Sequence, residues 1–131
     1  MYGFTGKILR VDLTKGKTSI DKVSDEDGRM FLGGRGLGTK ILYQDLKPGV
    51  NPLGPENELL FMTGPIAGVA VAGNARYCVM CRSPATGGLG EAHAAGYFGP
   101  RMKWAGFDGV AVRGISSEPV YIWAHGGKGE I

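Results

Sequence analysis

Two segments rich in small residues carry the side chains best suited to bind a ligand. One lies before a predicted strand and the other beyond it. The members of interest are Asn74, Ala75 and Arg76 in the first segment, and His93, Ala94, Ala95 and Gly96 in the second. Small side chains leave backbone N–H groups accessible, and an arginine adds a planar set of donors, so together they suit a phosphate or a polar heterocycle. Tight packing of loops over a sheet would use the same small residues, and the residue types alone leave both interpretations open.

The sequence lacks the motifs of a complete catalytic site. It has only two histidines and lacks the Gly-x-Ser-x-Gly and His-Glu-x-x-His patterns. The glycine cluster around Arg35 does not have the spacing of a dinucleotide-binding loop, and it follows a predicted helix rather than a strand. We therefore expect no catalytic residue and no self-contained metal site in these residues.

Cys78 and Cys81 form a Cys-x-x-Cys pair, a spacing that can indicate a redox or metal site. Their neighbours are β-favouring residues, and side chains three apart on a strand point to opposite faces. Two thiols also supply only half of the ligands of a typical zinc or iron–sulfur site. We interpret the pair as two small strand residues.

The composition is that of a globular protein with an unusual glycine content. Glycine accounts for 24 of 131 residues, and the formal net charge is only +3. Basic residues are scattered among acids, which argues against a nucleic-acid partner. The sequence has neither an apolar signal core nor an apolar run long enough to cross a membrane, so we expect a cytoplasmic protein without a membrane partner.

These segments must be positioned by strands and short helices that do not alternate regularly. Strands are predicted at residues 6–12, 18–22, 58–62, 76–82, 109–113 and 120–124, and helices from Ser24 to about Leu32 and at 37–44. A third helix is predicted directly after Tyr97, with Pro100 in its first turn and Gly106 as its C-terminal cap. Residues 91–96 are expected to connect elements. This order indicates an α+β fold: a β-rich platform with β-sheets and a few short helices. The last two residues have the character of another strand, so residues 1–131 are predicted to form one domain that is incomplete at its C-terminus.

An ordered set of motifs resembles the N-terminal part of the aldehyde ferredoxin oxidoreductase family, which contains tungsten-pterin oxidoreductases. No motif is diagnostic alone, but the set covers essentially the whole chain in the family's order. The motifs are Gly6–Gly16 (GKILRVDLTKG), Phe31–Gly38 (FLGGRGLG), Asn51–Asn57 (NPLGPEN), Thr63–Pro65 (TGP), Arg76–Tyr77, Ser83–Gly87 (SPATG), Gly96–Gly99 (GYFG), Lys103–Asp108 (KWAGFD) and Pro119–Tyr121 (PVY).

The resemblance implies a platform that binds a tungsten or molybdenum bis-pterin (tungstopterin or molybdopterin). It also implies that the ligands of a [4Fe–4S] cluster lie outside this chain. By resemblance, Arg76 lies between pterin and cluster. His93 and Ala95 match positions that contact the pterin phosphates and their bridging Mg²⁺, where Asn and Gly are usual. Imidazole is a poorer Mg²⁺ ligand than an amide oxygen, so we favour a phosphate or cofactor contact for His93 over a catalytic role.

The implied activity is oxidation of a small aldehyde to a carboxylic acid, with ferredoxin as electron acceptor. The implied partners are the remainder of the same polypeptide, ferredoxin and further copies of the chain in a homo-oligomer. Two alternatives remain: part of a related subunit that reduces aromatic thioesters, and a non-catalytic module that binds pterin or a partner protein. The 131-residue chain alone is not expected to be active.

Overall fold

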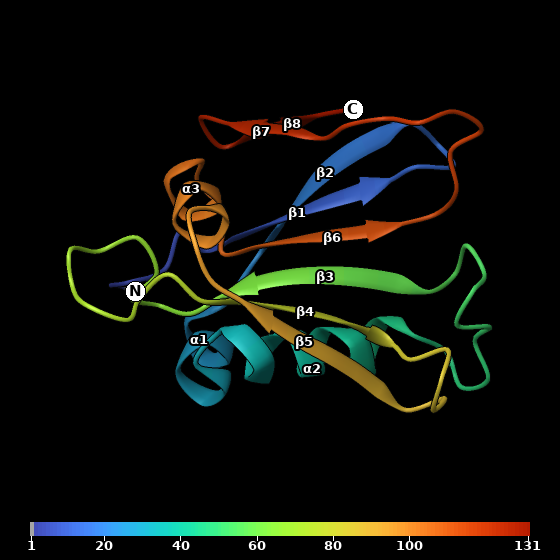
Figure 1. Cartoon of the computed structure of the whole chain (residues 1–131), viewed down its shortest axis with the longest axis horizontal. Helices are drawn as coiled ribbons and strands as arrows, with labels where there is room; N and C mark the ends of the chain where they lie inside the picture. Colours follow the sequence, from blue (N-terminus) through green and yellow to red (C-terminus); the bar gives the residue numbers. More distant parts are fainter. Residues whose placement is uncertain (1) are drawn as a thin grey trace.

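The computed structural model describes residues 2–131, which form a six-stranded mixed sheet, three helices and a separate two-stranded sheet (Figure 1). The strands of the large sheet are β1 (Lys7–Asp12), β2 (Lys17–Lys22), β3 (Glu58–Thr63), β4 (Tyr77–Arg82), β5 (Leu89–Ala94) and β6 (Gly109–Arg113). The helices are α1 (Asp25–Phe31), α2 (Gly34–Asp45) and α3 (Phe98–Trp104), and the small sheet consists of β7 (Trp123–His125) and β8 (Lys128–Glu130).

The large sheet has the strand order β2-β1-β6-β3-β4-β5. Strands β1 and β2 form one antiparallel group, and strands β3, β4 and β5 form another. Strand β6 joins them because it pairs in parallel with β1, starting at Ile8 opposite Gly109, and antiparallel with β3. The edges of the sheet are therefore β2 and β5.

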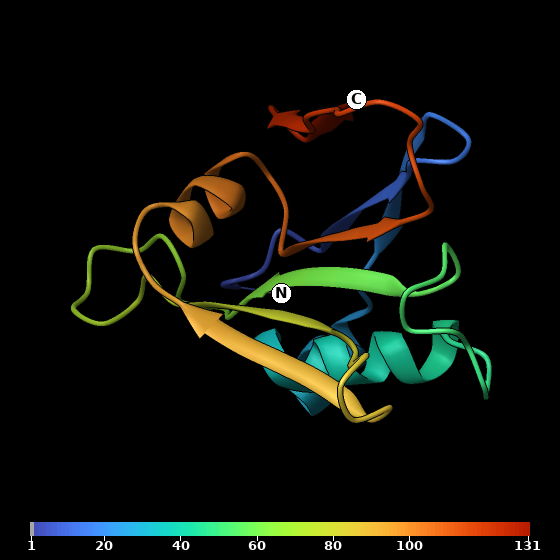
Figure 2. The same cartoon turned by 45° about the vertical axis from the view of Figure 1, so that its right-hand side comes forward.

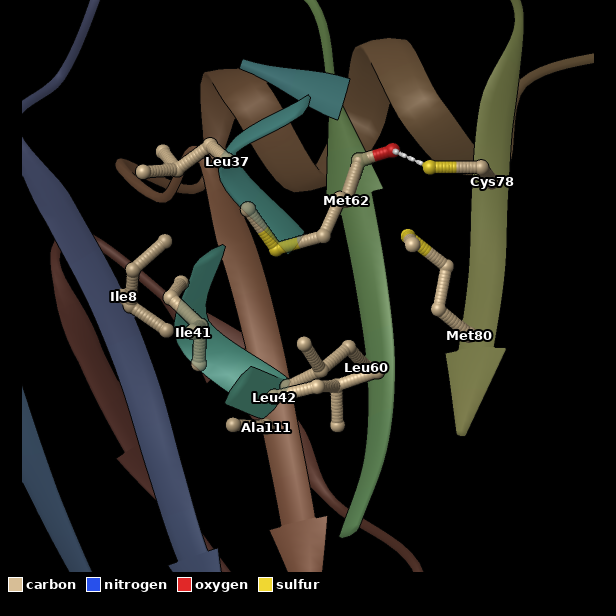
Figure 3. Close-up of a cluster of buried hydrophobic side chains, with 9 residues drawn as sticks. All are labelled: Ile8, Leu37, Ile41, Leu42, Leu60, Met62, Cys78, Met80 and Ala111. Carbon is tan, nitrogen blue, oxygen red and sulfur yellow. Dashed lines mark hydrogen bonds between the residues drawn. The ribbon is translucent and has the colours of Figure 1, made fainter. Parts of the chain in front are cut away.

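One face of the sheet is covered by α1 and α2, and its apolar side chains form the main core (Figures 1 and 3). Helix α2 directs its apolar side toward strands β1, β3, β4 and β6, where Leu60, Met62 and Met80 are completely buried. The members of this core are Ile8, Leu37, Ile41, Leu42, Leu60, Met62, Cys78, Met80 and Ala111. Burial of each large apolar side chain of this core stabilises the fold by about 1.5–3 kcal/mol.

The opposite face packs against α3 and the segment that leads into β7 (Figure 2). Its core consists of Leu9, Val11, Met102, Phe107 and Val110. Since side chains alternate along a strand, neighbouring residues such as Ile8 and Leu9 contribute to different cores. Both faces of the central strands are thus buried.

Asp108, at the start of β6, ties the N-terminal segment to the sheet. Its side chain is 1% exposed, accepts hydrogen bonds from the backbone N–H groups of Thr5 (3.0 Å) and Gly6 (2.7 Å), and is paired with the ammonium group of Lys103. The Thr63 hydroxyl donates to the Asp108 carbonyl at 2.8 Å. The buried carboxylate is thereby supplied with donors from two parts of the chain, and the Asp108 carbonyl receives one from a third.

The structure confirms the predicted α+β class, the N-terminal hairpin, the helix capped by Ser24 and the strands at 58–62, 76–82 and 109–113. The Ser24 hydroxyl accepts from the N–H of Asp27 at 3.0 Å, as expected of an N-cap. Within residues 2–131, none of the helices is long and apolar enough to cross a membrane.

Two predicted boundaries are wrong, whereas the position of the third helix is confirmed. Helix α2 begins at Gly34 rather than near Leu37, because Gly33 takes a φ of +78° and starts the helix without a polar side-chain cap. Helix α3 begins directly after Tyr97 with Pro100 in its first turn, and Gly106 follows its C-cap with a φ of +102°, as predicted. The strand predicted at 120–124 starts at Trp123, and residues 128–130 form its partner β8.

The segment expected to connect elements at residues 91–96 is mostly strand. Residues up to Ala94 belong to β5, which pairs with β4 from Tyr77 opposite Ala94 to Arg82 opposite Leu89. Ala and Gly have low β propensity, and the hydrogen bonds supplied by β4 override that local preference.

Candidate functional site

The predicted ligand-binding residues gather at the end of the sheet where β4 begins and β5 ends. The long loop between β3 and β4, seen in yellow-green at the left of Figure 1, lies beside α3 at this end. A pocket of about 300 Å³ is lined here by Gly34, Arg35, Met62, Gly64, Ile66, Ala67, Gly73, Asn74, Arg76, Tyr77, Cys78 and His93. Three predicted residues, Asn74, Arg76 and His93, therefore share one pocket, which we call the arginine pocket.

A second pocket of about 610 Å³ adjoins the first through Asn74. Its lining is mostly apolar and consists of Gly68, Val69, Ala70, Asn74, Ala75, Gly96, Tyr97, Pro100 and Trp104. The Trp104 indole N–H donates to the Gly68 carbonyl at 3.0 Å and holds the loop against α3. Two more predicted residues, Ala75 and Gly96, thus lie around this second opening.

The remaining two predicted residues line neither pocket. Ala94 is the last residue of β5 and lies opposite Tyr77 in the sheet, and Ala95 follows it as an exposed residue of the turn. Gly96 completes this turn with a φ of +104°, a conformation that side-chain-bearing residues rarely adopt. The turn fixes where β5 stops and α3 starts.

Arg76 has a free guanidinium. It is exposed at the start of β4 and makes no hydrogen bond or ion pair with any of residues 2–131. All five of its N–H donors are accordingly available to a ligand, and their planar arrangement suits phosphate or ring acceptors.

His93 belongs to a chain of charged contacts that sequence reasoning missed. Its Nε2 contacts Glu91 Oε1, and the same oxygen accepts a hydrogen bond from Arg35 Nε at 2.6 Å. The hydrogen bond from Arg35, and after it the one from His93, lowers the pKa of the Glu91 carboxyl below its ordinary value. Strand periodicity was the available signal: residues 91 and 93 share one face of β5, but the alanines and glycine around them concealed the strand.

Cys78 and Cys81 lie on opposite faces of β4, as their strand spacing predicts. Cys78 is buried in the core below α2, and its Sγ lies 3.7 Å from the Met62 carbonyl oxygen (Figure 3). Burial is the main cause that raises the pKa of this thiol. Cys81 faces the other side of β4, and both thiols are free. Within residues 2–131, no cluster of three or more histidine, cysteine, aspartate or glutamate side chains could hold a metal ion.

The arginine pocket fits an anionic group better than a Mg²⁺ ion. Its lining contains two arginines and a histidine but no carboxylate. Mg²⁺ prefers oxygen ligands, whereas the His93 Nε2 is already engaged by Glu91. The side chains present therefore suit phosphate and ring acceptors of a pterin, and they do not provide a protein ligand set for Mg²⁺.

Known proteins similar to this chain identify its family. Residues 8–131 match the family model described as "Aldehyde ferredoxin oxidoreductase, N-terminal domain". A tungsten-containing aldehyde ferredoxin oxidoreductase of Pyrococcus abyssi is 40% identical over 131 residues, which are all of this chain and 22% of the relative. The WOR-like subunit of an aliphatic sulfonate oxidoreductase from Pyrococcus furiosus is 38% identical over 134 residues, covering 21% of that protein.

A solved structure is also similar. It is the active-site complex BamBC of benzoyl coenzyme A reductase in complex with 1,5-dienoyl-CoA, with a TM-score of 0.94 and 37% identity over 98% of this chain and 20% of that one. The chain thus spans about a fifth of the length of these relatives. Together with the match over residues 8–131, this shows that the chain belongs to the aldehyde ferredoxin oxidoreductase family.

Proposed function

We propose that this chain forms the cofactor-binding platform of an oxidoreductase that carries a tungsten or molybdenum bis-pterin. The observation that carries the proposal is the free guanidinium of Arg76, which lines a pocket together with Asn74 and His93. Membership in a family with tungsten-containing relatives supports the identity of the ligand.

Three residues of the arginine pocket have distinct roles in this proposal. Arg76 donates hydrogen bonds to acceptors on the pterin and offsets their negative charge. Asn74 lies where the two pockets meet and can donate or accept through its amide, and the His93 ring faces the same space. The bound metal-pterin would supply the two-electron redox chemistry, while these residues bind and orient it.

The proposed reaction of the whole protein is oxidation of a small aldehyde to a carboxylic acid. Its electrons would leave through a [4Fe–4S] cluster, held by cysteines outside this chain, to ferredoxin. The partners in this proposal are the remainder of the polypeptide, ferredoxin and a second copy in a homo-oligomer. Reduction of an aromatic thioester is a second candidate, favoured by the similarity to the benzoyl coenzyme A reductase complex.

The platform role is tested by metal and phosphorus analysis of the full-length protein and its Arg76→Ala variant. We expect tungsten or molybdenum with pterin phosphorus in the wild type and a loss of roughly tenfold or more in the variant, because a charge-assisted contact is removed. Arg29→Ala is the matched control, since Arg29 is an exposed arginine of α1 that lines neither pocket. Equal cofactor content in all three proteins would contradict the role of Arg76.

The two candidate reactions are distinguished with the same preparation. Aldehyde-dependent reduction of ferredoxin, without reduction of an aryl-CoA thioester, supports the first candidate. The opposite result supports the second and leaves the platform role of this chain unchanged.

A further inference from the structure

A further pocket lies at the end of the sheet where β3 begins, whereas the arginine pocket lies where β3 ends. Its volume is about 610 Å³, and its lining includes side chains from β1, β2, β3, β6 and the end of α2. Charged residues of both signs predominate in this lining. We call it the Glu58 pocket, after the first residue of β3.

Glu58 brings a buried carboxylate with one unused oxygen to this pocket. The residue is 4% exposed, and its Oε1 accepts a hydrogen bond from Arg10 at 2.6 Å. The other oxygen, Oε2, is buried and has no hydrogen-bond partner among residues 2–131. Since a buried carboxylate oxygen without a donor is costly, a donor supplied by a ligand would be bound favourably.

The positive charge beside Glu58 is shared among three carboxylates. Arg10 also contacts Asp21, at 2.7 Å from its Nε, and Asp45, at 2.6 Å from its NH1 group. Asp45 is the last residue of α2, and the last turn of this helix contains no basic residue that would offset the negative end of its dipole. This side of the Glu58 pocket therefore attracts a further cation.

An ammonium group suits this side better than a metal ion does. Among residues 2–131, no cluster of histidine, cysteine, aspartate or glutamate side chains could hold a metal ion. The Arg10 guanidinium already lies between the three carboxylates and would repel a divalent ion. An ammonium group needs only an acceptor for its N–H donors, and Glu58 Oε2 provides one.

The opposite side of the Glu58 pocket carries an unpaired cation. Four charged residues lie opposite one another in turn on β2, β1, β6 and β3: Lys17, Asp12, Arg113 and Glu58. Asp12 pairs with Arg113 at 3.2 Å, whereas Lys17 makes no hydrogen bond or ion pair within residues 2–131. Three strand spacings, roughly 14 Å, separate the backbones at the two ends of this row. An unused cation and an unused acceptor thus line one pocket from its two sides.

We propose that the Glu58 pocket binds a small zwitterion whose ammonium and carboxylate groups are separated by several carbon atoms, as in an ω-amino acid. The ammonium group donates to Glu58 Oε2 beside Asp45, and the carboxylate accepts from Lys17. An α-amino acid carries its two charges on adjacent atoms and does not reach both sides. This binding requires no metal-pterin, so it stands independently of the proposed function.

The first measurement is a ligand-observed NMR titration of the full-length protein with γ-aminobutyrate, n-butylamine and butyrate. The first probe carries both charges, and each of the others carries only one of them on a chain of the same length. We expect γ-aminobutyrate to bind roughly threefold more tightly than n-butylamine, because it adds an exposed contact with Lys17. Butyrate should bind most weakly, since the buried side of the pocket repels it.

The second measurement repeats the titration with variants. Glu58→Gln is expected to weaken γ-aminobutyrate and n-butylamine alike by roughly tenfold, because it removes the charge that holds the ammonium group. Lys17→Gln should weaken γ-aminobutyrate to the level of n-butylamine and leave n-butylamine unchanged. Lys22→Gln, on the same strand but outside the Glu58 pocket, is the matched control and should bind as the wild type does.

Asp45→Asn provides a second test of the ammonium side if Glu58→Gln prevents folding. The Asp45 side chain is 36% exposed, so its loss should weaken both amines while the protein stays folded.

A wild type that binds none of the probes would overturn the proposal. So would a folded Glu58→Gln variant that binds both amines as the wild type does. Burial is the main cause that raises the pKa of the Glu58 carboxyl, and glutamine would then reproduce a neutral acid whose own proton occupies Oε2. Equal binding of γ-aminobutyrate and n-butylamine, unaffected by Lys17→Gln, would contradict the zwitterionic class of the ligand.

Discussion

Arg76 and Asp108 are charged residues near the same end of the sheet, but their surroundings are opposite. Arg76 is exposed and makes no polar contact within residues 2–131, so its binding capacity is unused. Asp108 is buried and every donor around it belongs to the chain itself: Lys103 and the N–H groups of Thr5 and Gly6. The first arrangement suits a ligand, and the second holds the fold together.

Replacing Asp108 by alanine is expected to destabilise the 131-residue chain by about 3–5 kcal/mol. The change leaves the ammonium group of Lys103 unpaired at 9% side-chain exposure and removes the acceptor of two backbone N–H groups. Urea denaturation followed by circular dichroism measures the difference. Asp12→Asn weakens the contact with Arg113, whose side chain is 57% exposed, keeps an acceptor for the Lys15 N–H and should move the transition far less; equal effects of the two changes would refute the argument.

Residue types predicted part of the site and missed the rest for a physical reason. Arg76 and His93 were identified from the sequence, and the structure places both in one pocket with Asn74. The Glu91 contact was missed because it depends on two facts outside the local sequence: residues 89–94 pair with β4, and Arg35 approaches from a helix 56 residues earlier. Long-range pairing of this kind cannot be read from spacing along the chain.

At the scale of elements, the contact between α1 and α2 requires a glycine. Gly36 lies in the first turn of α2, directly against the carbonyl group of Phe31 at the end of α1. A Cβ at this position would overlap the Phe31 carbonyl oxygen, which is backbone and cannot rotate away. The tight connection between the two helices sets the position of Arg35, which lies next to Gly36.

Gly36→Ala is therefore expected to destabilise the chain by about 1–3 kcal/mol, although alanine is the better helix former. A shift of α2 would also move Arg35, which lines the arginine pocket, so the metal and phosphorus content of the full-length protein should fall together with stability. Differential scanning calorimetry and elemental analysis measure the two effects. The control is Gly88→Ala, where an added Cβ meets only Thr86 Oγ1 at 3.7 Å; a Gly36 variant as stable as this control would contradict the expectation.

Elements with strong local signals were predicted well, and those that depend on neighbours were not. Strand β3 is apolar and β1 alternates, so both were found within a residue or two. The first turn of α2 has the sequence Gly-Arg-Gly and lacks a side-chain cap, and β5 is half alanine and glycine. In both cases packing against the rest of the domain supplies what propensity does not.

At the scale of the whole molecule, the described part of the sheet leaves apolar surface and two pairing edges, β2 and β5, open. Strand β5 has no neighbour on its outer side among residues 2–131. On the α3 face, Leu59, Phe98 and Trp123 are 39%, 48% and 56% exposed. An apolar pocket of about 410 Å³ lies between α3 and β7 on this face. Surfaces of this kind favour association with further protein.

The 131-residue chain on its own is expected to associate as its concentration rises. Sedimentation velocity at several concentrations should show an increasing mean sedimentation coefficient. Ala92→Lys adds a charge to an exposed position of the β5 edge and should suppress this increase, whereas Lys22→Arg on the opposite edge strand β2 should not. A wild type that stays monomeric at all concentrations would contradict the expected association through the β5 edge.

The position of β6 in the sheet determines when the sheet can close during synthesis on the ribosome. Strands β3, β4 and β5 pair with near neighbours in the chain, as do β1 and β2. The two groups meet only through β6, whose residues 109–113 emerge about a hundred residues after the β1 partners they bind. During synthesis, both groups can therefore pair internally before β6 emerges, and closure of the sheet awaits this central strand.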